Sequence, residues 1–149
     1  MSILKILTVP NPGLRQKSKG IKKEKILALK SFVSSMLTTM AQNDGVGLAA
    51  PQVGKNIRLI TISKEATPDK KDWVLINPKI TKRSWRKEAA AEGCLSVPGE
   101  IREIKRCAKI NIEALSALGK PLKFSAAKLF ARVIQHEIDH LDGILIIDK

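Results

Sequence analysis

Both histidines of this 149-residue chain lie in one short stretch, residues 135–140 (QHEIDH). His136 and His140 are four residues apart, so in a helix they lie one turn apart on the same face. Two imidazoles in this arrangement can bind one metal ion, and Glu137 can reach a water molecule on that ion. The spacing therefore predicts a metal-binding helix at the centre of the fold. The alternative is a chance motif, because such short patterns also arise in ordinary helices.

The sequence around the histidines is typical of an amphipathic helix. No Gly or Pro interrupts residues 126–142, Ser125 is a candidate N-cap, and Gly143 is a candidate C-terminal stop. Apolar residues recur at helical spacing and form a stripe beside the histidines. The stripe consists of Ala126, Ala127, Phe130, Ile134, Ile138 and Leu141. We expect the histidines at the edge of this buried face, at the base of a pocket.

Composition indicates one domain, residues 1–149, with an aliphatic core. Apolar residues make up 44% of the chain, whereas aromatic residues make up only 3%. No apolar run is long enough to span a membrane, and the N-terminus lacks the cleavage pattern of a signal peptide. We therefore expect a cytoplasmic protein, or an organelle matrix protein whose transit peptide has been removed.

The remaining elements predict the α+β class, with antiparallel β-sheets packed around the central metal-binding helix. An irregular arm is expected first, followed by a helix and then by strands in series. The expected ranges are 3–20 for the arm, 22–41 for the helix, and 58–63, 73–76, 104–112 and 122–124 for strands. The Asn77-Pro78 dipeptide is expected to stop the second strand. Alternation in the third strand places Cys107 on its lysine-rich face.

Positive charge is concentrated in the first part of the chain. The net charge is +13; residues 1–90 contain 18 Lys/Arg and 6 Asp/Glu (+12), and residues 91–149 contain 9 and 8 (+1). A basic region of this kind favours contact with a polyanion such as RNA, the ribosome surface or an acidic membrane. The alternative is a solvated, lysine-rich surface. With so few aromatic residues for base stacking, sequence-specific recognition of nucleic acid is not expected.

The third metal ligand is expected upstream of the two histidines. Catalytic zinc-type sites use three protein ligands and keep one position open, and only nine residues follow His140. Cys94 lies in a glycine-flanked bend, where a thiolate can be presented, whereas Cys107 lies within a strand. We therefore predict a site of Cys94, His136 and His140. The alternative for Cys94 is a small buried side chain.

Three segments together resemble a known family. Residues 45–52 (GVGLAAPQ), 92–96 (EGCLS) and 135–141 (QHEIDHL) are similar, in order and separation, to the three signature motifs of the peptide deformylases. The resemblance implies a metal-dependent amidohydrolase that removes the formyl group from formyl-methionine at the N-terminus of nascent polypeptides and releases formate. It implies the same three ligands, with Fe(II) as the typical metal and Zn(II), Ni(II) or Co(II) as other occupants.

The resemblance also implies roles for further residues. Glu137 is expected to take up the proton of the attacking water and to pass it to the leaving amine. The side chain of Gln52 and the backbone N–H of Leu95 are expected to stabilise the oxyanion. Asp139 is expected to orient the helix through an ion pair with Arg106, or else to be a solvated surface acid.

The resemblance further implies how the formyl-Met peptide binds. Backbone groups of Val46 and Gly47 on one side, and of Gly93 on the other, are expected to pair with the peptide as an added strand. The methionine side chain is expected in an apolar pocket lined by Val46, Leu129 and Val133.

Many bacterial members of the family continue into a C-terminal helix that helps docking on the ribosome, whereas this sequence stops at Lys149. We therefore expect any ribosome contact to use the basic N-terminal half. Two other functions compete with deformylation. One is a metallopeptidase acting on internal peptide bonds; the other is an RNA- or ribosome-binding protein that keeps the motif as a relic.

Overall fold

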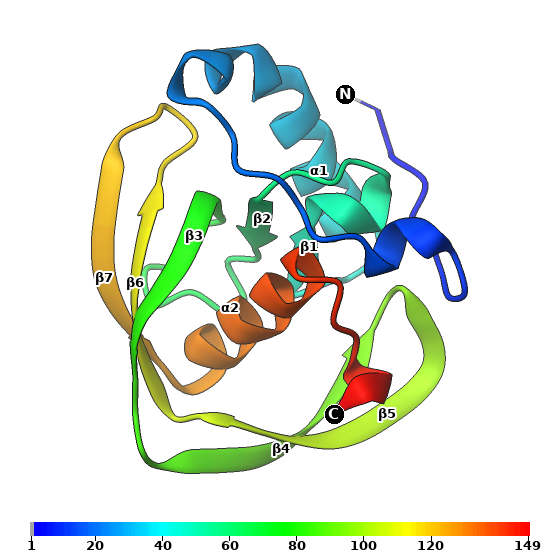
Figure 1. The fold of residues 1–149 in the computed structure, drawn as a ribbon, viewed down its shortest axis with the longest axis vertical. Helices are drawn as coiled ribbons and strands as arrows, with labels where there is room; N and C mark the ends of the chain where they lie inside the picture. The colour runs from blue at the N-terminus through cyan, green and yellow to red at the C-terminus, as the bar shows by residue number, and fades with distance from the viewer. Residues whose placement is uncertain (1) are drawn as a thin grey trace.

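The computed structural model describes residues 2–149, and Figure 1 shows its arrangement. The chain contains two α-helices and seven β-strands in this range, joined by loops and short 3-10 helices. The helices are α1 (Lys30–Gln42) and α2 (Lys128–Leu141). The strands are β1 (Gly47–Ala49), β2 (Leu59–Ile62), β3 (Trp73–Arg83), β4 (Lys87–Cys94), β5 (Val97–Cys107), β6 (Lys109–Leu115) and β7 (Pro121–Ala127). No helix within residues 2–149 is long and apolar enough to cross a membrane.

The strands form two antiparallel sheets around α2. Five strands pair in the order β1-β2-β3-β6-β7, and β4 pairs with β5 in a separate hairpin. Figure 1 shows α2 in the middle of the molecule, with the larger sheet on one side and the hairpin passing across the other. This arrangement confirms the expected α+β class with antiparallel sheets around a central helix.

The buried face of α2 fills the space against the larger sheet. Phe130, Ile134, Ile138 and Leu141 all belong to the main apolar cluster, together with Ile and Leu side chains of β2, β3 and β6. Burying an apolar side chain of this size stabilises the fold by roughly 1.5–3 kcal/mol. The predicted stripe is therefore the face that holds α2 in place, and the histidines lie beside it.

The predicted start of α2 is wrong. The helix begins at Lys128, because residues 126 and 127 belong to β7 and pair with Ile110 and Lys109 of β6. The Ser125 hydroxyl does not cap the helix; it donates to Asn111 Oδ1 at 2.8 Å. Ala126 is buried in the main apolar cluster, as the predicted stripe requires, but Ala127 is exposed because neighbouring residues of a strand point to opposite faces.

The predicted helix over residues 22–41 is wrong in its first half. Two 3-10 turns, Lys23–Lys25 and Leu27–Leu29, precede α1. Ile26 is buried and Leu29 is half-buried, a spacing of three that fits the 3-10 repeat as well as an α-helix. The apolar periodicity therefore could not distinguish the two kinds of turn.

Asn77 and Pro78 do not stop β3, which continues to Arg83 with a register shift after Ile76. Asn77 has φ 52°, and its side chain both accepts from Ile21 N and donates to Ile21 O at 2.8 Å. These bonds hold the N-terminal arm against the bulge. Since a bulged residue needs no ladder bond, the strand tolerates proline here.

Cys107 is buried in the main apolar cluster and does not face the lysine-rich surface. The predicted strand over residues 104–112 is two strands, β5 and β6, which lie in different sheets on either side of Ala108. Within this range the even-numbered positions of both strands are buried, and the alternation fails only at the corner, where Arg106 and Cys107 are both buried. Gln135 of α2 stabilises the corner, because its amide accepts from Cys107 N at 3.1 Å and donates to Cys107 O at 2.9 Å.

The N-terminal arm ties the first motif to the second. Leu7 N donates to the carbonyl of Gln52 at 2.7 Å, and Val9 N donates to the carbonyl of Ser96 at 2.9 Å. The arm is irregular, as predicted, yet its backbone bonds fix two segments that are more than forty residues apart in the sequence.

Candidate metal centre

Three side chains from two distant elements meet beside α2. Cys94 is the last residue of β4, just before the two-residue turn Leu95–Ser96, while His136 and His140 lie one turn apart on α2. The donor atoms of the three residues all lie within 4.8 Å of one another. Cys94 Sγ is 3.3 Å from His140 Nε2, which is 3.3 Å from His136 Nε2.

These separations fit a metal site. Bonds of roughly 2.1 Å to nitrogen and 2.3 Å to sulfur, set at a tetrahedral angle, place donor atoms roughly 3.4–3.6 Å apart. The sulfur and the two Nε2 atoms converge at nearly this spacing. One thiolate and two imidazoles are a donor set for a transition metal, with one coordination position left for a water molecule or substrate.

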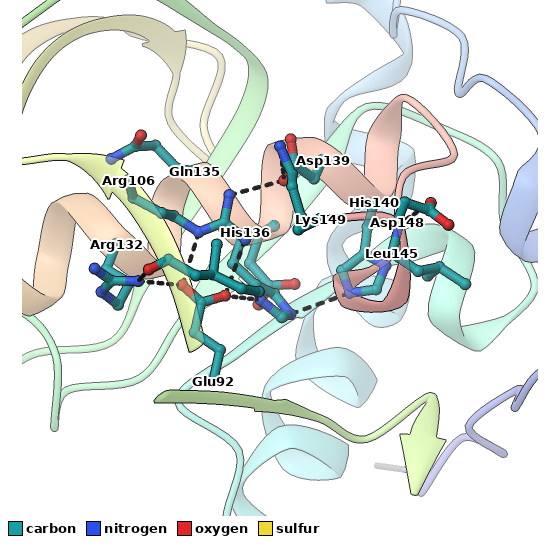
Figure 2. A network of polar contacts seen from close by, with 12 residues as sticks. Glu92, Arg106, Arg132, Gln135, His136, Asp139, His140, Leu145, Asp148 and Lys149 are labelled. Carbon is teal, nitrogen blue, oxygen red and sulfur yellow. Dashed lines mark hydrogen bonds and ion pairs between the residues drawn. The ribbon is translucent and has the colours of Figure 1, made fainter. Parts of the chain in front are cut away.

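Glu92 orients one of the two imidazoles. Its Oε1 is 2.8 Å from His136 Nδ1, so the Nε2 atom of that ring is directed toward the other donors. Arg106 forms two hydrogen bonds to the Glu92 carboxylate at 2.7 and 2.9 Å, and Arg132 forms another at 2.6 Å. Figure 2 shows Glu92 between the two guanidinium groups and the imidazole.

Asp139 is part of the same network. It accepts from Arg106 at 2.8 Å, and Lys149 Nζ lies 3.4 Å from it. The expected ion pair between Asp139 and Arg106 is therefore present, and it links α2 to β5. The solvated-surface alternative for Asp139 is wrong.

The network keeps Glu92 ionised and shifts the pKa values of the two imidazoles in opposite directions. Burial favours the neutral carboxyl, but hydrogen bonds from His136, Arg106 and Arg132 hold the pKa of Glu92 well below its usual range. Burial also disfavours the His136 cation, yet the charge of Glu137 and the contacts to Cys94 and Glu92 raise its pKa to about 10. Burial and the His136 charge lower the pKa of His140. A metal ion competes with protons for these nitrogens, because it binds neutral imidazole.

Glu137 is an acid suited to exchange a proton near neutral pH. Only 3% of the residue is exposed, and burial raises the pKa of its carboxyl to about 7. Its Oε2 lies 4.0 Å from His136 Nε2, and its Oε1 has no hydrogen-bond partner among residues 2–149. The free oxygen can therefore bond to a molecule bound at the site.

Gln52 is held beside the cysteine. Its Oε1 accepts from Ala49 N at 2.9 Å, which directs the amide nitrogen toward Ser96 Oγ at 3.1 Å and Cys94 Sγ at 3.7 Å. Leu95 lies in the turn between the paired residues Cys94 and Val97, so its N–H is outside the β4–β5 ladder. Two N–H groups are thus placed next to the candidate metal ligands.

A groove of about 530 Å³ opens over these residues. Its lining includes the predicted binding residues Val46, Gly47, Gly93, Leu129 and Val133, and also Gln52, Cys94, Leu95, His136 and Glu137. The structure thus brings every predicted site residue together, since His140 is in contact with Cys94 and His136. Glycine is required at position 47, because a Cβ there would lie 2.7 Å from both Glu137 Oε2 and Val133 Cγ1.

A model of the polypeptide deformylase family matches residues 3–149. The chain belongs to this family. The peptide deformylase of Dictyoglomus thermophilum is 44% identical over 149 residues, which cover 99% of this chain and 92% of the relative. The family consists of metal-dependent hydrolases, in agreement with the donor set described above.

Solved deformylase structures share the whole fold. The crystal structure of peptide deformylase from Thermotoga maritima aligns with a TM-score of 0.92 at 36% identity, covering 100% of this chain and 98% of that one. A peptide deformylase from Acinetobacter baumannii with bound Met-Ala-Ser aligns with a TM-score of 0.93 at 28% identity, covering 99% and 98%.

Sequence reasoning assigned no role to two residues of this deformylase site, Glu92 and Arg132. Glu92 had a signal, because it directly precedes Gly93 and Cys94 in the second motif. Arg132 had a weaker one, an arginine one turn before His136 on the helix. Neither position reveals its partner, since β4 and α2 approach each other only in the folded chain.

Proposed function

We propose that residues 1–149 form a single catalytic domain that removes the N-formyl group from formyl-methionine at the start of nascent polypeptides and releases formate. One observation carries the proposal. A groove with an apolar wall is lined by two members of the Cys-His-His donor set, by the buried acid Glu137 of raised pKa, and by the two residues that offer N–H donors, Gln52 and Leu95.

Cys94, His136 and His140 would hold the metal ion. The bound metal lowers the pKa of a water molecule, which makes a nucleophile available near neutral pH. We favour Fe(II) as the metal of the cell because the family resemblance implies it. The soft thiolate and two imidazoles would also accept Zn(II), Ni(II) and Co(II).

Glu137 is proposed as the group that moves the proton. Its pKa of about 7 lets it accept a proton from the attacking water and later donate it to the leaving amine. Gln52 Nε2 and the Leu95 N–H are proposed to donate to the oxygen that becomes negative when the formyl carbon is attacked. Their fixed positions mean that little reorganisation accompanies the reaction.

The peptide is proposed to bind as a strand between two sheet edges. Within the described chain β1 pairs only with β2, and β4 pairs only with β5, so each has an unpaired edge. The backbone at Val46 and Gly47 would pair with one side of the peptide, and Gly93 with the other. The Met-Ala-Ser ligand of the Acinetobacter baumannii relative is a short peptide of this kind.

The methionine side chain is proposed to lie against Val46, Leu129 and Val133. Val46 and Leu129 are 44% and 48% exposed, which is high for side chains of this type. Covering them with substrate would remove apolar surface from water.

Formate release tests the function directly. Protein loaded anaerobically with Fe(II), and in parallel with Zn(II), is incubated with a formyl-Met dipeptide and with unformylated casein. We expect fast formate release with iron, slower release with zinc and no cleavage of casein. Cleavage of casein would favour the metallopeptidase. Ribosome binding by a metal-loaded protein that releases no formate would favour a ribosome-binding protein that keeps the motif as a relic.

The basic N-terminal segment is proposed to contact the ribosome, which places the enzyme in the cytoplasm or in an organelle matrix. Six lysines between residues 17 and 30 are exposed, and none forms an ion pair with a described residue. They are Lys17, Lys19, Lys22, Lys23, Lys25 and Lys30. Glu24 is the single acid of the segment, so the positive field favours a polyanion.

A further inference from the structure

A second cavity, open to the surface, adjoins the groove of the metal centre. Its volume is about 340 Å³, and three alanines of β4 and Cys107 line it beside the charged residues Glu88 and Lys128. Ala91, Leu129 and Arg132 line both this cavity and the groove. These three side chains therefore form the wall between the two spaces.

Arg132 is the polar part of this wall, and its position is fixed. One guanidinium nitrogen donates to Glu92 Oε2 at 2.6 Å and to the carbonyl of Ile104 at 3.0 Å. The other donates to the carbonyl of Glu88 at 2.6 Å. Its side chain is only 13% exposed, and it joins α2 to both strands of the hairpin. Figure 2 shows it reaching from α2 to Glu92.

We propose that Arg132 is a specificity-determining residue that closes the inner end of the methionine pocket. Leu129, which is part of the proposed pocket, borders the second cavity as well. An apolar side chain longer than methionine would run into the Arg132 guanidinium. The inference rests on the proposed deformylase function and concerns the length of the first side chain that the enzyme accepts.

The fixed guanidinium makes the closure effective. To let a longer apolar chain pass, Arg132 would have to give up bonds to two main-chain carbonyls and one buried carboxylate, leaving polar groups without partners. With the arginine removed, the alanines and Cys107 that line the second cavity become continuous with the pocket and can receive additional methylene groups.

The test compares two substrates in each enzyme, formyl-norleucyl-alanine and formyl-2-aminooctanoyl-alanine, which differ by two methylene groups. The quantity measured is the ratio of their kcat/KM values from formate release, with equal metal content confirmed for each preparation. In Arg132→Ala we expect the ratio of the longer to the shorter substrate to rise roughly tenfold above that of the wild type.

Arg106→Lys is the matched control, because Arg106 also bonds to Glu92 but lines neither cavity. It should lower both kcat/KM values together and leave their ratio unchanged. Adding Ala89→Leu to Arg132→Ala should return the ratio toward the wild-type value, since Ala89 lines only the second cavity. Leu129→Ala removes another side chain between the groove and the second cavity and leaves the bonds of Glu92 intact. It replaces Arg132→Ala in the test if that variant does not fold.

The outcomes separate the two proposals. A wild type that releases formate, with the same ratio in the opened variants as in Arg106→Lys, overturns the role of Arg132 and leaves the deformylase function standing. A wild type that releases no formate from either peptide overturns both.

Discussion

At the scale of single residues, the site depends on one buried carboxyl whose pKa lies near neutrality. Replacing Glu137 by Gln keeps the shape of the side chain and removes its capacity to take up a proton. We expect Glu137→Gln to retain its metal and to lose about 10²–10⁴-fold in kcat. Metal content and formate release, measured on the same sample, check this. Loss of the metal would contradict the role of Glu137 in proton transfer.

Gly47 has no room for a side chain. A Cβ there would meet Glu137 Oε2 and Val133 Cγ1, both at 2.7 Å, so Gly47→Ala must displace both side chains or shift its own backbone. We expect a loss of about 1–3 kcal/mol in the free energy of unfolding, from the overpacking, and a fall in kcat/KM. Denaturant titration and formate release measure the two effects.

Gly20→Ala is the control for this prediction. Its added Cβ would lie 3.7 Å from Asn77 Oδ1, an ordinary contact distance. Equal losses in the two variants would show that replacing glycine, and not crowding of the site, is the cause.

At the scale of elements, an ion pair joins the N-terminal arm to the segment that follows α2. Arg15 forms an ion pair with Asp148, and it also donates to the carbonyl of Gly143, two residues beyond the end of α2. The hydrogen bonds from Arg15 and from Leu145 N lower the pKa of Asp148 below its usual value of 3.8. The folded state therefore favours the ionised carboxylate.

The sign of the pH dependence follows from this lowered pKa. The stabilisation by Asp148 is fully present above about pH 4, and it is lost as the pH falls through the folded-state pKa. Because the pair is partly exposed, we expect Asp148→Asn to lower the free energy of unfolding by up to about 1 kcal/mol at pH 7. The difference from wild type should shrink on acidification. A difference that stays constant down to pH 2 would rule out ionisation as its cause.

The sequence predicted α2 and its histidines because both the apolar stripe and the ligands follow one local repeat. It predicted the Cys94 ligand because nothing downstream of His140 could serve. It misplaced the start of α2, since only pairing with β6 shows that residues 126 and 127 are extended. The contacts of Glu92 with Arg132 and His136 depend on how the hairpin crosses α2. The bulge at Asn77 depends on bonds to the N-terminal arm. Local sequence could therefore predict neither the contacts of Glu92 nor this bulge.

At the scale of the whole molecule, the exposed lysines between residues 17 and 30 lie outside the groove of the candidate metal centre. We expect replacement of Lys22, Lys23 and Lys25 by Gln to weaken binding to ribosomes and to reduce its dependence on salt concentration, because fewer phosphates are neutralised. Sedimentation with ribosomes at several salt concentrations measures both quantities. Release of formate from a dipeptide should be unaffected.

Lys64, Lys70 and Lys71, replaced by Gln together, provide a control with the same change of charge. These lysines are also exposed but share their loop with Asp69 and Asp72. Equal weakening by both triple variants would mean that net charge alone, and not the segment from 17 to 30, governs the contact.

The arm at Leu7 and Val9, the turn after Cys94 and the ligand His140 all have to be present before the site is complete. A copy still being translated therefore has no complete centre until residue 140 has been made. A growing chain cannot use its own site on its own N-terminus before that point.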